Sequence, residues 1–347
     1  MARPRSRHRS RRFWWENCTN KELLDLRLCD LGVSIAGTWL EERISILHRE
    51  LADRRLRVRP HVWLSSEWFC PDGIAGIAVP FYLAHPRLMR LERSQMLEVD
   101  GGDPRECLRL LRHETGHAVH HAFALQRRRR WQRLFGPSST PYPDVYRPNP
   151  TSKRFVVHLD LWYAQAHPDE DFAETFALWL APRSGWRRRF AGWPALKKLE
   201  YVDELMDELA GTRPLARSRR RVETLSSLRM TLREYYRQKR ERYKPAHTHV
   251  YDRELKEIFA DGTRTRRGEP AARFLRRNRT RIRNRVRRWA SDHMVALDQV
   301  FEDMAGRCGD LKLRAVRSER CLLEEFTVLL TVKTMQYLYR VREWHAL

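Results

Sequence analysis

Long apolar runs are absent from the 347-residue sequence. No stretch reaches the roughly 18 apolar residues that a transmembrane helix requires, so a membrane span is not expected. Paired cysteines are also absent, because the six cysteines lie far apart and form no C-x-x-C motif. We therefore expect reduced thiols and a cytoplasmic protein. The basic first residues are followed by no apolar segment, so a secretory signal is not expected either.

Positive charge is abundant and unevenly distributed. The formal net charge is +24, with 34 basic and 27 acidic side chains in residues 1–210 but 34 and 17 in residues 211–347. The shift falls at Gly211-Thr212-Arg213-Pro214, which we interpret as a domain boundary. Hydrophobic residues make up 42% of the chain, which excludes wholesale disorder. We expect three regions: a basic N-terminal arm (1–19), a first domain (20–212) and an Arg-rich helical domain (213–347).

Hydrophobic periodicity separates strand-like from helix-like segments. Residues 56–65 alternate apolar and polar side chains, which predicts a strand. Residues 74–83 and 88–92 are further candidate strands, and the prolines that interrupt them favour a sheet edge. Residues 106–126 have the spacing of one amphipathic helix. Another helix is expected to begin near Pro168, because proline suits a first helical turn.

The predicted helix over residues 106–126 contains His113-Glu114-Thr115-Gly116-His117, which is an H-E-x-x-H motif. Histidines four residues apart lie on one face of a helix, so both imidazoles can bind one metal ion, and zinc suits these ligands. Glu114 stands beside the first ligand, where a carboxylate can take a proton from a water molecule at the metal. A chance match in a chain with 14 histidines is the alternative.

A catalytic zinc site needs a third protein ligand and leaves one position for water. His121 lies one turn beyond His117 and could reach the same ion only with strain. The better candidate is the segment from His167 to Ala177, in which Glu170 and Glu174 stand four residues apart on one helical face. The alternative for these carboxylates is an exposed first turn that the helix dipole favours.

These two segments resemble the gluzincin metallopeptidases, whose third zinc ligand is a glutamate on a helix after the H-E-x-x-H helix. The sequence looks most like a bacterial family of zinc-binding metallopeptidases with H-E-x-G-H followed by E-D-F-A-E-T-[FW]-A. Both motifs are present here, the second over residues 170–177. The catalytic domain of anthrax lethal factor is a more distant resemblance in pattern, with H-E-F-G-H and E-F-F-A-E-A-F. The resemblance covers residues 50–210 and none of residues 211–347.

The resemblance implies that the chain binds one Zn2+ ion and hydrolyses peptide bonds. Its three zinc ligands would be His113, His117 and Glu170. Glu114 would be the general base for the water that attacks the peptide carbonyl, and would then protonate the leaving amine. Tyr163, seven residues before Glu170, would stabilise the oxyanion with the metal; a packing role for this aromatic ring is the alternative. Glu174 would hydrogen-bond a ligand histidine and fix its tautomer.

The resemblance also implies an α+β fold. It comprises a zincin-like catalytic domain with a small, antiparallel-edged sheet, the H-E-x-x-H helix and a second ligand-bearing helix, followed by a mainly α-helical basic domain. In such folds an antiparallel edge strand binds the extended substrate. Gly73–Val79 is our candidate, because its small residues would let a second backbone approach. An ordinary strand within a small sheet is the alternative.

We therefore predict a zinc-dependent metallopeptidase that acts on protein or peptide substrates. The alternative is a nucleic-acid-binding or scaffold protein with an inactive or structural metal site. Arginine runs in residues 213–347 could bind phosphates or an acidic partner, although charge runs on helices are more often solvated faces. A structural zinc site usually has four protein ligands, so an open position beside Glu114 favours catalysis.

Overall fold

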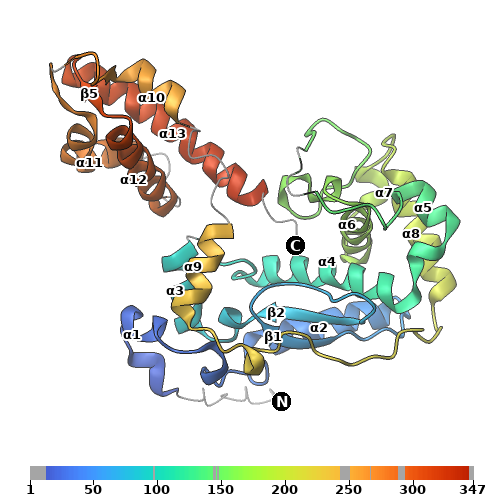
Figure 1. Ribbon diagram of the computed structural model, residues 1–347. Helices are drawn as coiled ribbons and strands as arrows, with labels where there is room; N and C mark the ends of the chain where they lie inside the picture. The colour runs from blue at the N-terminus through green and yellow to red at the C-terminus, as the bar shows by residue number, and fades with distance from the viewer. Residues whose placement is uncertain are drawn as a thin grey trace, which may run out of the picture. The chain divides into compact units, whose positions relative to one another are not determined.

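The computed structural model describes residues 13–96, 98–143, 146, 148–242, 251–265, 267–287 and 294–343. The chain forms two compact units: the first ends at Arg242, and the described part of the second begins at Tyr251. Figure 1 shows the helices and strands of both units, and each unit has its own hydrophobic core. Both are mainly helical with a small sheet, which is compatible with the predicted α+β class. Among the described residues, no helix combines the length and hydrophobicity needed to cross a bilayer.

The regular elements follow in chain order. The first unit contains α1 (Asn20–Leu24), α2 (Trp39–Asp53), β1 (His61–Ser65), β2 (Gly76–Pro80), α3 (Pro86–Met96), α4 (Pro104–Phe123), α5 (Arg129–Phe135), α6 (Pro168–Leu180), α7 (Trp186–Arg189), α8 (Leu196–Leu209) and α9 (Leu232–Arg242). Its short 3-10 helices are η1 (Trp14–Asn17), η2 (Leu28–Asp30), η3 (Phe81–Ala84), η4 (Leu125–Arg127), η5 (Asp160–Gln165) and η6 (Leu225–Ser227). The second unit contains α10 (Asp252–Ile258), β3 (Ala260–Asp261), β4 (Glu269–Pro270), α11 (Ala271–Arg287), α12 (Met294–Asp310), β5 (Leu313–Ala315) and α13 (Glu319–Glu343).

The chain is anchored in the first core from Phe13 onward, so the predicted N-terminal arm over residues 1–19 is too long. Trp15 is fully buried, and its Nε1–H donates a 3.0 Å hydrogen bond to the carbonyl oxygen of Leu31. The ring of Phe13 stacks on that of Trp15, with 4.9 Å between the centroids. Residues 1–12, which form most of the predicted arm, lie outside the described residues.

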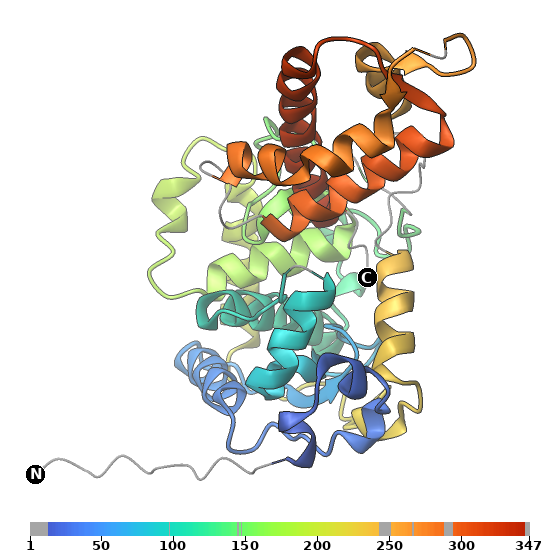
Figure 2. The same ribbon diagram turned by 90° about the vertical axis from the view of Figure 1, so that its left-hand side faces the viewer.

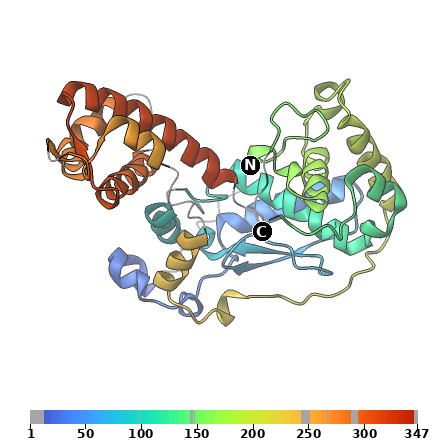
Figure 3. The same cartoon turned by 45° about the horizontal axis from the view of Figure 1, so that its top comes forward.

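The predicted domain boundary at residue 212 is also wrong, because the chain stays with the first unit to Arg242. Residues 212–231 run along β1 (Figures 1 and 3). Three side chains of β1 bond to backbone carbonyl oxygens of this segment: His61 to Arg220, Trp63 to Val222, and Ser65 to Glu223. Beyond it, α9 buries Leu232 and Tyr236 in the first core. The charge shift reflects exposed arginines, whereas the boundary depends on where apolar side chains are buried.

The sheet of the first unit consists of β1 and β2, which pair in parallel along their whole length. Among the described residues, the predicted antiparallel edge is represented by one isolated antiparallel bridge, between Phe69 and Ala78. The connecting residues 66–75 run back beside the sheet, and within them Phe69 exchanges backbone hydrogen bonds of 2.8 and 3.4 Å with Ala78 of β2. The predicted substrate-binding edge over Gly73–Val79 is thus already paired on both sides at Ala78. Strand pairing is a nonlocal choice that apolar alternation does not specify.

Residues 86–96 form α3, so the strand predicted over residues 88–92 is wrong. Pro86 occupies the first helical position, where the missing N–H costs nothing. The ring Nδ1 of His85 accepts a hydrogen bond from the backbone N–H of Arg87 at 3.2 Å. Leu88 and Leu91 are three residues apart and both buried, which is a helical spacing.

The helices α4 and α6 approach closely at Gly116, and this contact positions the predicted site. A Cβ atom added to Gly116 would lie 2.6 Å from the Cα and 3.0 Å from the carbonyl oxygen of Ala173. Glycine on one helix and alanine on the other therefore let the two backbones touch. Side chains one turn away on either helix then face each other across a short gap.

Replacing Gly116 with alanine will destabilise the first unit by about 1–3 kcal/mol, because α6 must move to admit the methyl group. The matched control is Gly306 of α12, where an added Cβ meets no atom within 4 Å. Gly306→Ala will stabilise its helix by roughly 0.5–1 kcal/mol. Differential scanning calorimetry of both variants checks this pair of opposite shifts. A midpoint for Gly116→Ala at or above that of the wild type would contradict the packing argument.

The second unit packs α11, α12 and α13 around the buried rings of Phe274, Phe301 and Phe326. Figure 2 shows α11 and α12 lying side by side. A three-stranded antiparallel sheet with the order β3-β5-β4 completes the unit. The predicted helical character of this region is thus present in its described residues, together with a small sheet that the sequence did not predict.

Four arginine side chains of α11 form close ion pairs within the second unit. Their carboxylate partners lie at 2.6–3.3 Å: Glu269 for Arg277, Glu302 for Arg279, Glu319 for Arg281, and Asp298 for Arg283. Exposed pairs of this kind contribute little to stability, but they partly neutralise the helix surface. Fewer guanidinium groups are therefore free to bind phosphates than the sequence suggests.

Candidate metal centre

Three donor atoms meet between α4 and α6. The Oε2 atom of Glu170 lies 3.0 Å from Nε2 of His113 and 3.3 Å from Nε2 of His117, and the two Nε2 atoms are 3.2 Å apart. These are the three side chains that the sequence predicts as zinc ligands. In the part of the chain that the structure describes, they form the one cluster of this kind that could hold a metal ion.

The spacing of the donor atoms fits a tetrahedral metal ion. Ligand atoms about 2.0–2.1 Å from zinc, at tetrahedral angles, lie about 3.3 Å from one another. The three observed separations are 3.0, 3.2 and 3.3 Å. Two imidazole nitrogens and one carboxylate oxygen are also the donor set of catalytic zinc sites, which keep their fourth position for water or substrate. The residues present therefore fit one zinc ion.

Local sequence signals explain how the two helices begin. The side chain of Asp103 caps α4 by accepting hydrogen bonds from the backbone N–H groups of Arg105 and Glu106, at 2.8 and 3.3 Å. His167 caps α6 in the same way, with Pro168 at the first helical position. Glu170 therefore lies in the first turn of α6, where the helix dipole favours a negative charge.

The second carboxylate of α6, Glu174, orients the ring of His113. Its Oε1 accepts a 2.9 Å hydrogen bond from Nδ1–H of His113. Its Oε2 accepts bonds from the backbone N–H groups of His158 and Leu159, at 3.1 and 2.8 Å. Because the Glu174 side chain is fully buried and every oxygen is occupied, the His113 ring is held with Nε2 toward the donor cluster.

Charges within the cluster stabilise one another. Burial opposes ionisation of Glu170, but the imidazoles of His117 and His113 hold the pKa of its carboxyl below the usual range. Burial likewise opposes protonation of His113, yet hydrogen bonds to Glu170 and Glu174 raise the pKa of its ring well above the usual value. A metal ion that binds here must displace protons from the histidines, so its affinity will fall at low pH.

The remaining acidic residue of the motif, Glu114, lies beside the cluster. Its side chain is buried, and burial raises the pKa of its carboxyl. It nevertheless lines the same cleft as His117 and Glu170. A carboxylate with a raised pKa beside a metal site holds a proton more firmly than an exposed carboxylate, which suits a group that takes up a proton and passes it on.

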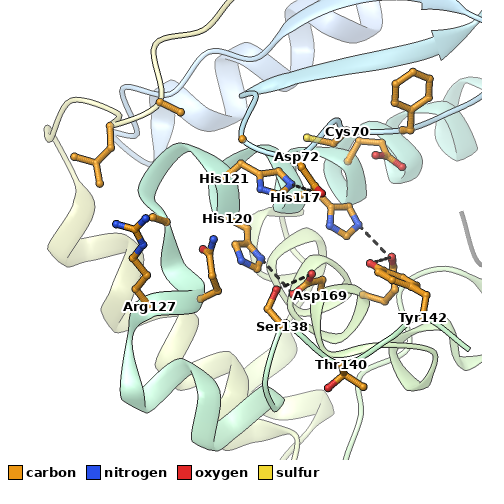
Figure 4. Close-up of a pocket in the computed structure, with 18 residues that line it drawn as sticks. Cys70, Asp72, His117, His120, His121, Arg127, Ser138, Thr140, Tyr142 and Asp169 are labelled. Atoms are coloured by element: carbon orange, nitrogen blue, oxygen red, sulfur yellow. Dashed lines mark hydrogen bonds and ion pairs between the residues drawn. The ribbon is translucent and has the colours of Figure 1, made fainter. Parts of the chain in front are cut away.

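The cluster opens into a cleft of about 950 Å³ (Figure 4). Residues 69–73, which follow β1, and the loop over residues 138–142 both contribute to its walls. The C-terminal half of α4 lines it between them, and Arg127 with residues 215–216 forms one end. Its volume is in the range of ligand-binding clefts, which is large enough for several residues of an extended peptide.

Tyr163, which the resemblance places at the metal site, lies beside His113. The centroids of the two rings are 5.6 Å apart, and Tyr163 is buried. It packs with Tyr146 and Ala166 in a small cluster and is not among the described residues that line the cleft. This position is that of a packing neighbour of the ligand ring, and oxyanion stabilisation by Tyr163 stays a prediction.

A different tyrosine, Tyr142, reaches the cluster from the loop. Its hydroxyl group donates a 3.0 Å hydrogen bond to Oε1 of Glu170, and its ring stacks on His167 with 3.7 Å between the centroids. It also lines the cleft (Figure 4). Tyr142 was not predicted, because it lies in a Pro-rich segment without periodicity, where the sequence does not indicate which aromatic side chain turns inward.

Replacing Tyr142 with phenylalanine will weaken zinc binding about tenfold, because the unconstrained Glu170 carboxylate must then be ordered by the metal itself. The stacking on His167 is retained in this variant. Competition with a chromophoric chelator measures the dissociation constant. Ser138→Ala is the control, since the Ser138 hydroxyl donates to Asp169 outside the donor cluster, at 2.9 Å. Equal affinity of Tyr142→Phe and wild type would show that this hydrogen bond does not hold the ligand.

Two other side chains that could have been the third ligand lie elsewhere. The Nε2 atom of His121 is 3.6 Å from an oxygen of Asp72. Asp171 forms a buried ion pair with Lys198 of α8. Neither side chain belongs to the donor cluster among the described residues.

The geometry thus defines a candidate mononuclear metal centre of the two-histidine, one-glutamate kind. The family model described as "Putative zinc-binding metallo-peptidase" matches residues 89–184. The matched segment contains α4, α6 and the whole donor cluster, and the predicted resemblance to zinc-binding metallopeptidases is confirmed over it. No curated protein and no solved structure matches the chain significantly. The match leaves the second unit uncovered.

Proposed function

We propose that the chain is a zinc-dependent peptidase, with His113, His117 and Glu170 as zinc ligands and Glu114 as the general base. The convergence of the three donor atoms within 3.3 Å of one another carries this proposal. The family match over residues 89–184 supports it, since the family is described as a metallo-peptidase.

The mechanism follows from the positions of the side chains. A zinc ion held here would polarise the scissile carbonyl and lower the pKa of a water molecule toward about 7. The Glu114 carboxylate accepts a proton from the water that attacks the carbonyl carbon. It then donates this proton to the nitrogen of the leaving amine as the C–N bond breaks, which yields a carboxylate and an amine. Glu174 keeps the proton of His113 on Nδ1, and Tyr142 keeps Glu170 in place.

Nucleic-acid binding, the alternative function, gains no support from the described residues. Its sequence evidence was the runs of arginines in residues 217–221, 276–288 and 314–320, and in the second of these runs four arginines of α11 are paired with carboxylates of the same unit. A structural metal site, which this alternative would require, usually has four protein ligands, whereas the donor cluster has three among the described residues. A peptidase accounts for the donor set, the adjoining Glu114 and the cleft together.

The proposal is tested by incubating the full-length, zinc-loaded chain with a mixture of unstructured peptides and identifying products by mass spectrometry. We expect cleavage that a chelator abolishes and that added zinc restores. Elemental analysis of the same sample should give about one zinc ion per chain. Cleavage that persists at full rate after complete metal removal, or a chain that binds no zinc, would contradict the proposal.

A further inference from the structure

The end of the cleft farthest from Tyr142 is formed by residues that follow α4. The helix ends at Ala124, whose backbone is left-handed with φ of 50° and ψ of 47°. The short helix η4 follows at once and carries Arg127 into the lining of the cleft. Figure 4 shows Arg127 on the opposite side of the pocket from His117 and Tyr142.

This end of the cleft is closed by the segment that follows α8. The backbone N–H groups of Leu215 and Ala216 both donate to the carbonyl oxygen of Ala122, at 2.8 and 3.2 Å. Both residues line the cleft together with Arg127. The bonds tie the segment to the last turn of α4, so the position of this wall relative to Arg127 is fixed by the fold.

Arg127 has no carboxylate partner among the described residues, whereas Arg128 and Arg130 do. The guanidinium group of Arg128 forms two bonds to Glu208, at 2.8 and 2.9 Å. That of Arg130 lies 2.5 Å from an oxygen of Glu204. The acidic residues of α8 therefore neutralise the two neighbouring arginines and leave the charge of Arg127 available in the cleft.

The other titratable groups of the cleft give it a clear polarity. Burial lowers the pKa of His120 to about 3 and also lowers the pKa of His121, so both rings are neutral at neutral pH. Asp72 and Asp169 line the cleft nearer the donor cluster (Figure 4). Outside the donor cluster, Arg127 is the one arginine or lysine among the described lining residues, and Figure 4 shows it away from Asp72 and Asp169.

The position of Arg127 determines which part of a substrate it can meet. Between His117 and Ala124 the axis of α4 rises about 10 Å, at 1.5 Å per residue. An extended peptide advances roughly 3.3 Å per residue. A peptide that leaves the donor cluster along α4 therefore reaches the end of this helix about three residues from the bond that is cleaved, and Arg127 follows directly on η4.

We propose that Arg127 binds a substrate carboxylate about three residues from the scissile bond, and that this makes the enzyme selective for acidic peptides. The inference rests on the proposed peptidase function. A guanidinium group pairs with a carboxylate through two parallel hydrogen bonds. Arg127 is exposed, and at an exposed site such a pair changes kcat/KM by up to about fivefold. An aspartate or glutamate side chain and the C-terminal carboxylate of the substrate both supply this group.

The test uses neutral peptides in which one glutamate is moved stepwise through the sequence, each with a free or an amidated C-terminus. In the zinc-loaded wild type, glutamate at one position about three residues from the cleaved bond should raise kcat/KM by up to about fivefold. Arg127→Gln should lose this preference, and Arg127→Glu should favour lysine there. Arg130→Gln is the matched control, because it also removes one arginine charge, but from a side chain that does not line the cleft. This variant should keep the wild-type preference.

The outcomes separate this inference from the proposed function. Cleavage without any acidic preference, or the same preference in Arg127→Glu as in the wild type, overturns the role of Arg127 and leaves the peptidase standing. A preference confined to peptides with a free C-terminus assigns the bound carboxylate to the chain end. Absence of cleavage by any form contradicts the proposed function. In that case, fluorescence anisotropy with labelled glutamate and glutamine peptides tests the role of Arg127 by binding alone. Equal affinity of the glutamate peptide for the wild type and for Arg127→Glu would overturn the inference.

Discussion

Replacing Glu114 with glutamine is expected to reduce kcat/KM for peptide hydrolysis by about a hundredfold to ten-thousandfold, which is the usual contribution of a general base. The amide has nearly the same volume as the carboxylate but cannot accept a proton from water. Glu114 is not one of the three donor residues, so the variant should still bind one zinc ion. Rate assays and elemental analysis of the same preparation measure the two properties together.

The stability of this variant provides a control against misfolding. Glu114 is buried, and burial raises the pKa of its carboxyl, so its ionised form is unfavourable in the fold. A neutral amide removes this penalty, and the unfolding midpoint of Glu114→Gln should equal or exceed that of the wild type. Full activity in a zinc-loaded variant would place the general base elsewhere in the cleft.

Local signals made α4 and α6 predictable from the sequence. The four-residue spacing of His113 and His117 fixes two imidazoles on one helical face wherever that helix lies. The same holds for Glu170 and Glu174, and Pro168 marked the beginning of their helix. The distance between the histidines of α4 and the glutamates of α6 depends, however, on how the two helices pack. From the sequence, only the family resemblance connected the two segments.

The features that escaped prediction all depend on contacts between distant residues. Tyr142 meets Glu170 because a loop without periodicity folds over the N-terminus of α6. The strands β1 and β2 pair in parallel because residues 66–75 return beside the sheet. The first unit continues to Arg242 because a few buried side chains, such as Leu232 and Tyr236, hold this segment in the first core. The many exposed arginines of the same segment do not change where it packs. Composition averages over a segment and therefore misses such anchors.

Replacing Glu170 with glutamine is expected to weaken zinc binding by more than a hundredfold, since outer partners of metal ligands alone account for about tenfold to a hundredfold. Its Oε2 is the one anionic donor in the cluster and lies 3.0 and 3.3 Å from the two histidine nitrogens. A neutral amide oxygen is a poorer zinc ligand and leaves the charge of the ion uncompensated in a buried site. Elemental analysis after dialysis and competition titration measure the loss.

Three carboxylates of α6 give a graded series that separates a ligand from its neighbours. Glu170→Gln should lose the most affinity, Glu174→Gln should lose about tenfold to a hundredfold through the freed His113 ring, and Asp169→Asn should lose least. Because zinc stabilises only the folded chain, a chelator should lower the unfolding midpoint of the wild type and leave that of Glu170→Gln unchanged. Full zinc occupancy in Glu170→Gln together with loss in Glu174→Gln would instead assign the third ligand to Glu174. The same outcome would require α6 to rotate, because Glu174 now bonds to the Nδ1 side of His113, away from His117.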